Sequence, residues 1–422
     1  MSERLRDDCF ALPPGVDWTP VDETLSRLRE RLHAVTDVEQ VPMDAAAGRI
    51  LAEDVLAARS NPPAANSAID GYAFAWSALG SNTDTEANLP LEPGRAAAGH
   101  PFKRAVPRGH ALRILTGAEV PDGTDTIVLQ EDANVGAGRV RFMPPKKQGS
   151  NCRGQGEDAL EGELALAARQ RLNAADLARL ASVGVAHVTV RKPLRVGVLS
   201  TGDELLQPGA DADQSGIFDA NRPMLSAMVR DFGHVPVDLG AQPDRATIIR
   251  DALDRGAAEC DAILATGGAS AGDEDHVSRL LRTEGKIDTW RIAVKPGRPL
   301  ALGMWNGVPV FGLPGNPVAA FVCTLVFARP ALSVMAGAAW AEPQGFMVPA
   351  AFSKQKKPGR REFLRARLNA AGAAEAFHSE GSGLIGGLSW SDGLVELPDG
   401  AMEVEPGVPV RYLPYAGFGL RV

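Results

Sequence analysis

The sequence predicts a multidomain fold of the α/β plus β class, with a mostly parallel sheet in its central domain. Three observations lead to this prediction. The chain has 422 residues, which is more than one hydrophobic core usually serves. Between residues 191 and 335, short apolar runs alternate with segments of helical periodicity, which is typical of βα repeats. On both sides of this stretch, short alternating runs are separated by Gly, Pro and Asp turns, which favours additional β domains.

These changes of pattern predict four domains. Helical periodicity in residues 1–61 returns in residues 155–190, so we expect the two stretches to form one split helical domain. Residues 62–154 then form an inserted β domain. Residues 191–335 form the central α/β domain, and residues 336–422 form a C-terminal β domain with a barrel-like sheet.

The first helix is expected at the start of the split domain. Thr19 and Pro20 form a helix-start signal, a hydroxyl cap followed by proline at the first helical position. Leu25, Leu28 and Leu32 then fall on one face, which indicates an amphipathic helix.

The two β domains are predicted from short strand-like runs. In the inserted domain the clearest candidates are residues 111–115 and 126–129. In the C-terminal domain they are residues 363–368, 394–397 and 408–412.

The central domain contains three strong strand candidates, at residues 194–200, 261–266 and 308–312. In a parallel sheet the loops after such strands gather on one edge and form the binding crevice. Each strand here leads into an unusual turn, so three distant motifs are expected to converge. They are residues 201–204 (Thr-Gly-Asp-Glu), 267–275 (Gly-Gly-Ala-Ser-Ala-Gly-Asp-Glu-Asp) and 313–317 (Leu-Pro-Gly-Asn-Pro).

The composition excludes several classes of partner. A formal net charge of −8 argues against nucleic acid or an anionic membrane as the main partner. The N-terminal residues are charged and no apolar segment follows them, so no secretory signal is expected. The longest apolar run, residues 318–328, has 11 residues and is too short to span a bilayer. We therefore predict a cytoplasmic protein.

Familiar catalytic motifs are absent from the sequence. It contains no Gly-x-x-x-x-Gly-Lys-Ser/Thr, and no Gly-x-Gly-x-x-Gly follows a strand into a helix, which disfavours P-loop chemistry and dinucleotide redox chemistry. It also has no His-Glu-x-x-His and no Gly-x-Ser-x-Gly, so a hydrolase of the common kinds is not expected.

The acidic residues of the turns point to a metal ion beside phosphates. Glycine-rich turns let the backbone approach a ligand, but nearby acids repel a phosphate unless a cation lies between them. Glu204 and Asp275 follow buried strands in this way, and hard oxygen ligands suit Mg²⁺. Asp244 can equally be a helix cap. For Asp273 and Glu274, a solvated face is the simpler interpretation.

Two loops offer groups for an anion. Lys295 and Arg298 lie in a Lys-Pro-Gly-Arg-Pro loop, which suits binding of a phosphate or tetrahedral oxyanion, although an exposed turn with solubilising charges explains it equally well. Residues 313–317 would present free backbone N–H groups at a helix start, or form only a tight turn.

Taken together and in order, these motifs resemble one family. The chain is similar to the molybdopterin molybdenumtransferase family, to which the gephyrin E domain is related, over nearly its whole length. The resemblance rests on residues 41–42, 48–55 (Gly-Arg-Ile-Leu-Ala-Glu-Asp-Val), 66–73 (Asn-Ser-Ala-Ile-Asp-Gly-Tyr-Ala), 113–118 (Arg-Ile-Leu-Thr-Gly-Ala), 156–158 (Gly-Glu-Asp), 201–205, 267–275, 295–299 and 313–317.

The resemblance implies a reaction and an assembly. The reaction is the insertion of molybdate into adenylylated molybdopterin, with Mg²⁺-dependent release of AMP. The assembly is an elongated homodimer of four-domain subunits. The implied partners are a molybdopterin adenylyltransferase and the molybdoenzymes, or their chaperones, that receive the product.

The resemblance also implies roles for individual residues. Glu204, Asp244 and Asp275 would form the acidic set at the metal ion and the phosphates. The residues implied to hold molybdate are Ser270, Lys295, Arg298, Arg360 and Ser382, and those implied to shape the pterin pocket are Pro314 and Pro317. Four further residues would reach the site from the partner subunit: Asp70, Thr116, Arg153 and Asp158.

The sequence departs mildly from the family pattern. Ile69 stands where Met is usual, Ala65 where a bulky residue is usual, and Arg298 and Arg291 where Lys is common. Arg298 keeps the charge but changes the donor geometry. A non-catalytic scaffold or cofactor chaperone would be expected to lack the acids, which are present. Another nucleotide-linked enzyme with the same α/β domain, such as an adenylyltransferase or a nicotinamide mononucleotide deamidase, would not need the flanking β domains.

Overall fold

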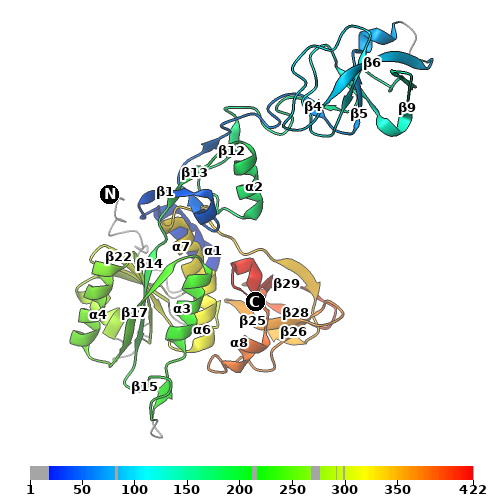
Figure 1. Ribbon diagram of the computed structural model, residues 1–422. Coiled ribbons are helices and arrows are strands. Elements are labelled where there is room, and N and C mark those ends of the chain that lie inside the picture. Colours follow the sequence, from blue (N-terminus) through cyan, green and yellow to red (C-terminus); the bar gives the residue numbers. More distant parts are fainter. Residues whose placement is uncertain are drawn as a thin grey trace.

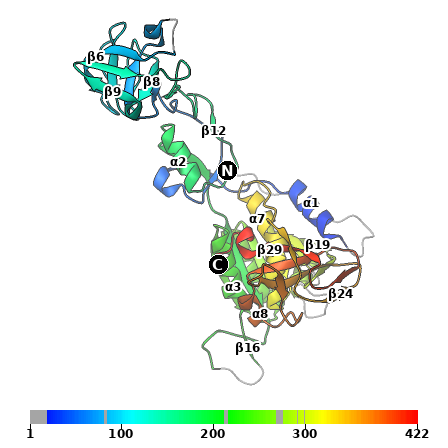
Figure 2. The same cartoon turned by 90° about the vertical axis from the view of Figure 1, so that its right-hand side faces the viewer.

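The computed structural model describes residues 19–80, 84–211, 216–267, 276–290, 292–297 and 300–421. The molecule is elongated, with a small β-rich body at one end and an α/β body and a C-terminal β body side by side at the other (Figure 1). Figure 2 shows the same separation after a 90° turn. A multidomain fold of mixed sheets is therefore confirmed, while the domain boundaries remain predictions.

The α/β body is built on a six-stranded sheet of order β17-β14-β18-β22-β21-β19. The first four strands are parallel, and β21 and β19 are antiparallel to their neighbours. Strand β18 is buried along its whole length, as expected for a strand covered on both faces. The strands are β14 (Arg195–Thr201), β17 (Val235–Gln242), β18 (Ala262–Thr266), β19 (Lys286–Trp290), β21 (Leu300–Trp305) and β22 (Val308–Leu313).

Helices cover both faces of this sheet. Side chains such as Leu225 of α3 and Phe321 of α6 belong to the larger core on one face. Leu253 of α4 and Leu281 of α5 belong to a second core on the other face. The helices are α3 (Asn221–Asp231), α4 (Ala246–Glu259), α5 (His276–Thr283), α6 (Pro317–Cys323) and α7 (Arg329–Met335).

The apolar run after Pro317 is longer as a helix than the sequence pattern indicates. A π-helical segment, Thr324–Ala328, joins α6 to α7, so the helix continues through Pro330. Within the described residues this helix, Pro317–Met335, is the one segment long and apolar enough to cross a membrane, with a mean hydropathy of 1.9. Because 89% of that window is buried inside the protein, its apolar side chains serve as core packing.

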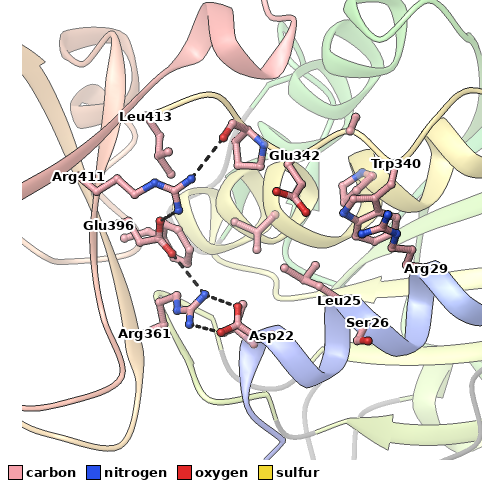
Figure 3. Close-up of a pocket in the computed structure, with 16 residues that line it drawn as sticks. Asp22, Leu25, Ser26, Arg29, Trp340, Glu342, Arg361, Glu396, Arg411 and Leu413 are labelled. Atoms are coloured by element: carbon pink, nitrogen blue, oxygen red, sulfur yellow. Dashed lines mark hydrogen bonds and ion pairs between the residues drawn. The ribbon is translucent and has the colours of Figure 1, made fainter. Parts of the chain in front are cut away.

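The N-terminal helix begins one residue later than predicted. Helix α1 (Val21–Arg31) follows Pro20, and Thr19 forms a β-bridge with Ile292 instead of capping it. Arg361 of the C-terminal body donates two hydrogen bonds to Asp22 of α1, 2.7 and 2.8 Å long. Figure 3 shows this contact among the residues that line a cavity of about 290 Å³ between α1, α7 and the C-terminal sheet.

The two segments predicted to form a split helical domain contain short strands as well as helices. Apart from α1 and a short 3-10 turn at Met43–Ala45, the described parts of 19–61 and 155–190 contain one helix, α2 (Ala174–Ser182). Most of the remainder is loop and turn, and its small sheet forms where β1 (Val38–Pro42) pairs with β13 (His187–Arg191). These two strands are far apart in sequence, so local periodicity could not reveal that they pair. The other strands are β2 (Ile50–Leu51), β3 (Val55–Leu56) and β12 (Leu164–Leu166).

The distal β body is formed by the middle of the N-terminal half. Its six-stranded sheet has the order β8-β5-β7-β6-β10-β9. An isolated bridge between Asn61 and Ala159 ties together the two segments through which the chain enters and leaves. The strands are β4 (Asn66–Ser67), β5 (Gly71–Phe74), β6 (Ala87–Ala96), β7 (Ala111–Ile114), β8 (Thr126–Leu129), β9 (Ala133–Gly136), β10 (Arg139–Phe142) and β11 (Cys152–Arg153).

The C-terminal body carries a sheet of order β20-β25-β27-β29-β23. Its first strand, β20 (Val294–Lys295), comes from the central stretch and pairs in parallel with β25. Strands β20 and β23 are its two edges, so the predicted barrel-like sheet is open in its hydrogen bonding among the described residues. The other elements are β23 (Phe346–Pro349), β24 (Lys354–Lys356), β25 (Arg361–Leu368), β26 (Ala374–Ala376), α8 (Gly386–Trp390), β27 (Gly393–Leu397), β28 (Met402–Val404) and β29 (Pro409–Pro414).

Candidate active site

A cavity of about 620 Å³ opens at the carboxyl edge of the central sheet. The ends of β14, β18 and β22 meet there, because Ser200 pairs with Thr266 and Thr266 pairs with Leu313. Residues of the C-terminal body, Gly383 and Ile385, complete its wall. From the α/β body it is lined by Thr201, Glu204, Leu205, Ile217, Phe218, Asp219, Ala220, Asn221, Thr266, Gly267, Pro314, Gly315, Asn316 and Pro317.

The strand ends approach each other closely because one of the turns begins with glycine. Gly267 has a φ of +98°, and a Cβ atom there would lie 2.1 Å from the carbonyl oxygen of Thr201. A side chain at this position would force the two turns apart. The strand followed by glycine thus places Gly267, the first residue of the second motif, beside the first motif at one edge.

A buried carboxylate fixes the start of α3 against this edge. Asp219 is 1% exposed and accepts hydrogen bonds from Ser200 Oγ at 3.1 Å and Arg222 Nε at 3.0 Å. Asn221 donates from Nδ2 to the carbonyl oxygen of Gly315 at 2.6 Å. These contacts hold the Leu-Pro-Gly-Asn-Pro turn beside α3, with Pro314 buried and Pro317 half-buried at the cavity.

The structure brings two of the three predicted metal-binding acids together. Desolvation raises the pKa of Asp244, and the charges of Asp203 and Glu204 raise it further. The backbone N–H of Asp244 donates to Asp203 Oδ1 at 3.1 Å. A carboxyl group whose pKa is raised by burial and by neighbouring carboxylates lies where a cation is favourable. Within the described ranges, no group of three or more potential ligands is already arranged for a metal ion.

Lys295 lies in a second, smaller cavity beside the first. This cavity has a volume of about 20 Å³ and is lined in part by Lys295, Val318, Arg365 and Glu380. The two cavities are neighbours, because adjacent residues at the start of α6 and nearby residues of the loop at 379–385 line one or the other. The carbonyl oxygen of Ser382, in that loop, accepts a 3.1 Å hydrogen bond from the backbone N–H of Val318. Lys295 and Ser382 are thus brought to the same region as Pro317.

Arg365 holds the loop that carries Ser382. It is 4% exposed, and its guanidinium donates to the carbonyl oxygens of Ser379, Gly381 and Leu384. Arg360, which the resemblance implies at molybdate, does not line either of these cavities, whereas Arg365 does.

The four residues implied to act from the partner subunit lie in or near the distal β body. Asp70 Oδ1 accepts hydrogen bonds from the backbone N–H of Thr116 at 2.7 Å and from its Oγ1 at 2.6 Å. These hydrogen bonds lower the pKa of Asp70. Arg153 and Asp158 line a separate cavity of about 370 Å³, which also contains Asn66. In one chain these residues are far from the central cavity (Figures 1 and 2).

The structure leaves some predicted residues outside its described part and adds others. Ser270, Asp275 and Arg298 lie outside the described residues, and so does Arg291, the other arginine that departs from the family pattern. Sequence reasoning missed several side chains at or beside the cavities, namely Asp219, Asn221, Lys354, Arg365 and Glu380. An Asp-x-Asn ahead of the helix at 221 was an available signal for the first two.

The chain matches three family profiles in succession. They are described as "MoeA N-terminal region (domain I and II)" at residues 19–184, "Probable molybdopterin binding domain" at residues 197–334 and "MoeA C-terminal region (domain IV)" at residues 347–415.

Full-length relatives agree with this assignment. A molybdopterin molybdenumtransferase of Haemophilus influenzae is 33% identical over 402 residues, covering 94% of this chain and 98% of that protein. One from a Nostoc species is 32% identical over 393 residues, covering 91% of this chain and 90% of that protein. The crystal structure of the molybdopterin biosynthesis moeA protein from Pyrococcus horikoshii OT3 superimposes with a TM-score of 0.82 at 28% identity, covering 94% and 100% of the two chains. The chain therefore belongs to the molybdopterin molybdenumtransferase (MoeA) family of enzymes.

Proposed function

We propose that this enzyme acts in molybdenum cofactor biosynthesis by inserting molybdate into adenylylated molybdopterin, with release of AMP. The observation that supports this most directly is the pair of adjoining cavities. One carries carboxylates at the edge of a parallel sheet, and the other carries Lys295 against the C-terminal body. In such a site, the phosphates of the substrate would bind in the first cavity and the oxyanion in the second.

The larger cavity has the size and position for the pterin and nucleotide parts. A volume of about 620 Å³ lies within the range of small-molecule sites, and carboxyl ends of parallel strands are where α/β proteins bind ligands. Pro314 and Pro317 would shape the pterin pocket in this proposal. Exposed Phe218 and Ile385 supply apolar area for planar rings.

Molybdate, a tetrahedral dianion, would be held at the smaller cavity. Of the residues implied by the family, Lys295, Arg360 and Ser382 are described. Lys295 lines this cavity and Ser382 lies in the loop beside it, next to Arg365, whereas Arg360 does not line it. Ammonium, guanidinium and hydroxyl donors suit a tetrahedral oxyanion. No protein nucleophile is needed, because the pterin dithiolate supplies the ligands to molybdenum. The protein contributes position and charge.

Glu204 and Asp244 fit a magnesium ion shared with substrate phosphates. Mg²⁺ is usually bound by one or two carboxylates together with phosphate oxygens and water. The mutual repulsion that raises the pKa of Asp244 would be relieved by such a cation. When bound, Mg²⁺ would offset the charge between the phosphates and these carboxylates, and Asp275 is the third acid proposed here.

The active form is proposed to be a homodimer. Asp70 and Thr116 are hydrogen-bonded to each other, and Asp158 accepts a hydrogen bond from Asn61. These residues and Arg153 lie in or near the distal β body, far from the α/β body of their own chain. A second copy would allow them to reach the central cavity across the interface. We also propose a cytoplasmic location and, as partners, the adenylyltransferase that supplies the substrate and the molybdoenzymes or chaperones that receive the product.

A non-catalytic scaffold on the same fold is the weaker alternative. A scaffold has no use for closely spaced carboxylates whose charges destabilise one another, yet Asp203, Glu204 and Asp244 are kept together.

The test is release of AMP from adenylylated molybdopterin in the presence of molybdate and Mg²⁺. Glu204→Gln keeps the shape but removes the charge, so we expect the rate to fall by roughly 100-fold or more. Asp275→Ala is expected to abolish release with the dimer intact. Asp251→Asn, an exposed change on α4, serves as the control and should keep the wild-type rate. Undiminished release by the Glu204 variant would refute the role given to this carboxylate.

A further inference from the structure

The positive charge of Lys295 is already satisfied inside the chain. Its Nζ lies 2.5 Å from Glu380 Oε2 and 3.5 Å from Glu362 Oε2. Lys354 binds the same two carboxylates, with Glu380 Oε1 in direct contact and Glu362 Oε2 at 3.1 Å. Glu380 therefore bridges two lysines with its two oxygens. We call these four residues the lysine–glutamate cluster.

The members of the cluster differ in how firmly they are held. Glu362 is part of strand β25 and its side chain is 8% exposed, so it is a fixed component of the C-terminal body. Glu380 lies in the loop after β26, and its side chain is 45% exposed. An exposed carboxylate on a loop can leave its partners at much lower cost than a buried one on a strand.

The cavity at Lys295 is too small for an oxyanion while Glu380 is in place. About 20 Å³ accommodates a guest no larger than a water molecule. A tetrahedral dianion carries four oxygens and needs more room. Glu380 lines this cavity together with Lys295, Ser379 and Arg365. The two oxygens of Glu380 contact the ammonium groups of Lys295 and Lys354. Two oxygens of an oxyanion bound there would make the same contacts.

We propose that Glu380 occupies the oxyanion position and competes with molybdate for Lys295 and Lys354, so that it sets the affinity and the selectivity of the site. A dianion with two or more well-placed oxygens can displace the carboxylate, whereas a weakly binding monoanion cannot. Lys354 thereby becomes a second binding residue, next to Lys295. This inference rests on the proposed function, because it assumes that the oxyanion binds at Lys295.

A structural role for Glu380 predicts the opposite effect. If its carboxylate served only to orient the two lysines, removing it would loosen them and weaken oxyanion binding. If it competes, removing it leaves two unpaired ammonium groups and a larger cavity, and oxyanion binding becomes tighter. The sign of the change in affinity therefore separates the two roles.

The experiment is calorimetric titration of the full-length protein with molybdate, tungstate and sulfate. In Glu380→Gln, which keeps the size but removes the charge, we expect Kd for molybdate and tungstate to fall roughly tenfold, as for the loss of two partly exposed ion pairs. Glu375→Gln is the matched control, since Glu375 pairs with Arg367 on the same sheet and lies outside the cluster. Its Kd should equal that of the wild type. The double variant Glu380→Gln/Lys354→Ala should lose the gain.

Each possible result of these titrations either supports or overturns the proposed competition. An unchanged or higher Kd in Glu380→Gln, with a normal melting temperature, overturns the competition. A gain that persists without Lys354 overturns the role of that lysine. Failure of the proposed function has a different readout. In that case the wild type would release no AMP in response to molybdate, whatever the titrations show. If release occurs, the KM for molybdate should fall in Glu380→Gln.

Discussion

At the residue scale, the polar side chains of the candidate site are held by backbone groups as much as by other side chains. Arg365 donates to three carbonyl oxygens of one loop, and Asn221 donates to the carbonyl oxygen of Gly315. Asp70 accepts from both the N–H and the hydroxyl of Thr116. Such contacts fix a rotamer before any ligand binds, which lowers the entropic cost of binding.

Thr116→Val should raise the pKa of Asp70. The hydroxyl of Thr116 is the largest cause of the lowered pKa of this carboxyl, and valine removes it while keeping the shape and the backbone N–H. A lowered pKa contributes stability that is present above the unfolded value and is lost as the pH falls through the folded value. The variant should therefore be less sensitive to acid at this site. NMR titration of the Asp70 carboxyl checks this, with Thr124→Val as the control, and an unchanged midpoint would contradict it.

At the element scale, one ladder of ion pairs joins helix α1 to the C-terminal sheet. Arg361 binds Asp22 of α1 and lies 3.4 Å from Glu396, which in turn contacts Arg411 at 2.6 Å (Figure 3). The Arg361 side chain is 14% exposed and that of Glu396 is 11% exposed. Removing one partner of such an ion pair destabilises the protein mainly because the other partner is left buried and unpaired.

Arg361→Met should loosen α1 more than it changes the rest of the molecule. The variant leaves Glu396 with a single cationic partner and removes the two hydrogen bonds to Asp22, at an expected cost of about 1–3 kcal/mol. Hydrogen exchange of the Val21–Arg31 amides should become faster, while that of β18 stays slow. Arg367→Met removes a comparable but more exposed pair and is the control. Equal protection of α1 in both variants would show that apolar packing alone holds the helix.

At the scale of the whole molecule, the distal β body is joined to the remainder by two adjacent chain segments. In the proposed homodimer, its polar residues would complete the site of the other subunit. A C2 dimer with reciprocal contacts would pair each distal body with the central cavity of the other subunit. In such a dimer, the elongated shape of the subunit would allow Asp70 and Arg153 to reach the cavity of the other subunit.

Subunit mixing tests this arrangement. Asp70→Ala and Glu204→Gln should each be inactive as homodimers, since every site lacks one residue. After the two variants are exchanged, a heterodimer has one site with both defects and one intact site. Random mixing should therefore restore roughly a quarter of wild-type AMP release. No recovery, with heterodimers demonstrated by native mass spectrometry, would mean that both residues act within one chain.

Much of the fold followed from local pattern, and some of it did not. The buried strands β14, β18 and β22 were predicted because apolar runs ending in glycine or polar turns are a local signal. The pairing of β1 with β13 was not predicted, because the two strands are separated in sequence by an intervening domain. The continuation of the helix through Pro330 was also not predicted. A π-helical segment precedes this proline, which lies in the first turn of α7.

The sequence by itself determined the family, the reaction class to be tested and the acids and cations proposed for the site, because each is encoded in short motifs whose order and spacing are fixed along the chain. Only the tertiary structure decided how those motifs meet. It placed Lys295 on a strand of the C-terminal sheet, paired it with Glu380, and kept the distal β body far from the α/β body within one chain. The physical reason is that an ion pair or a cavity depends on distances between residues remote in sequence, which packing sets and no local pattern records.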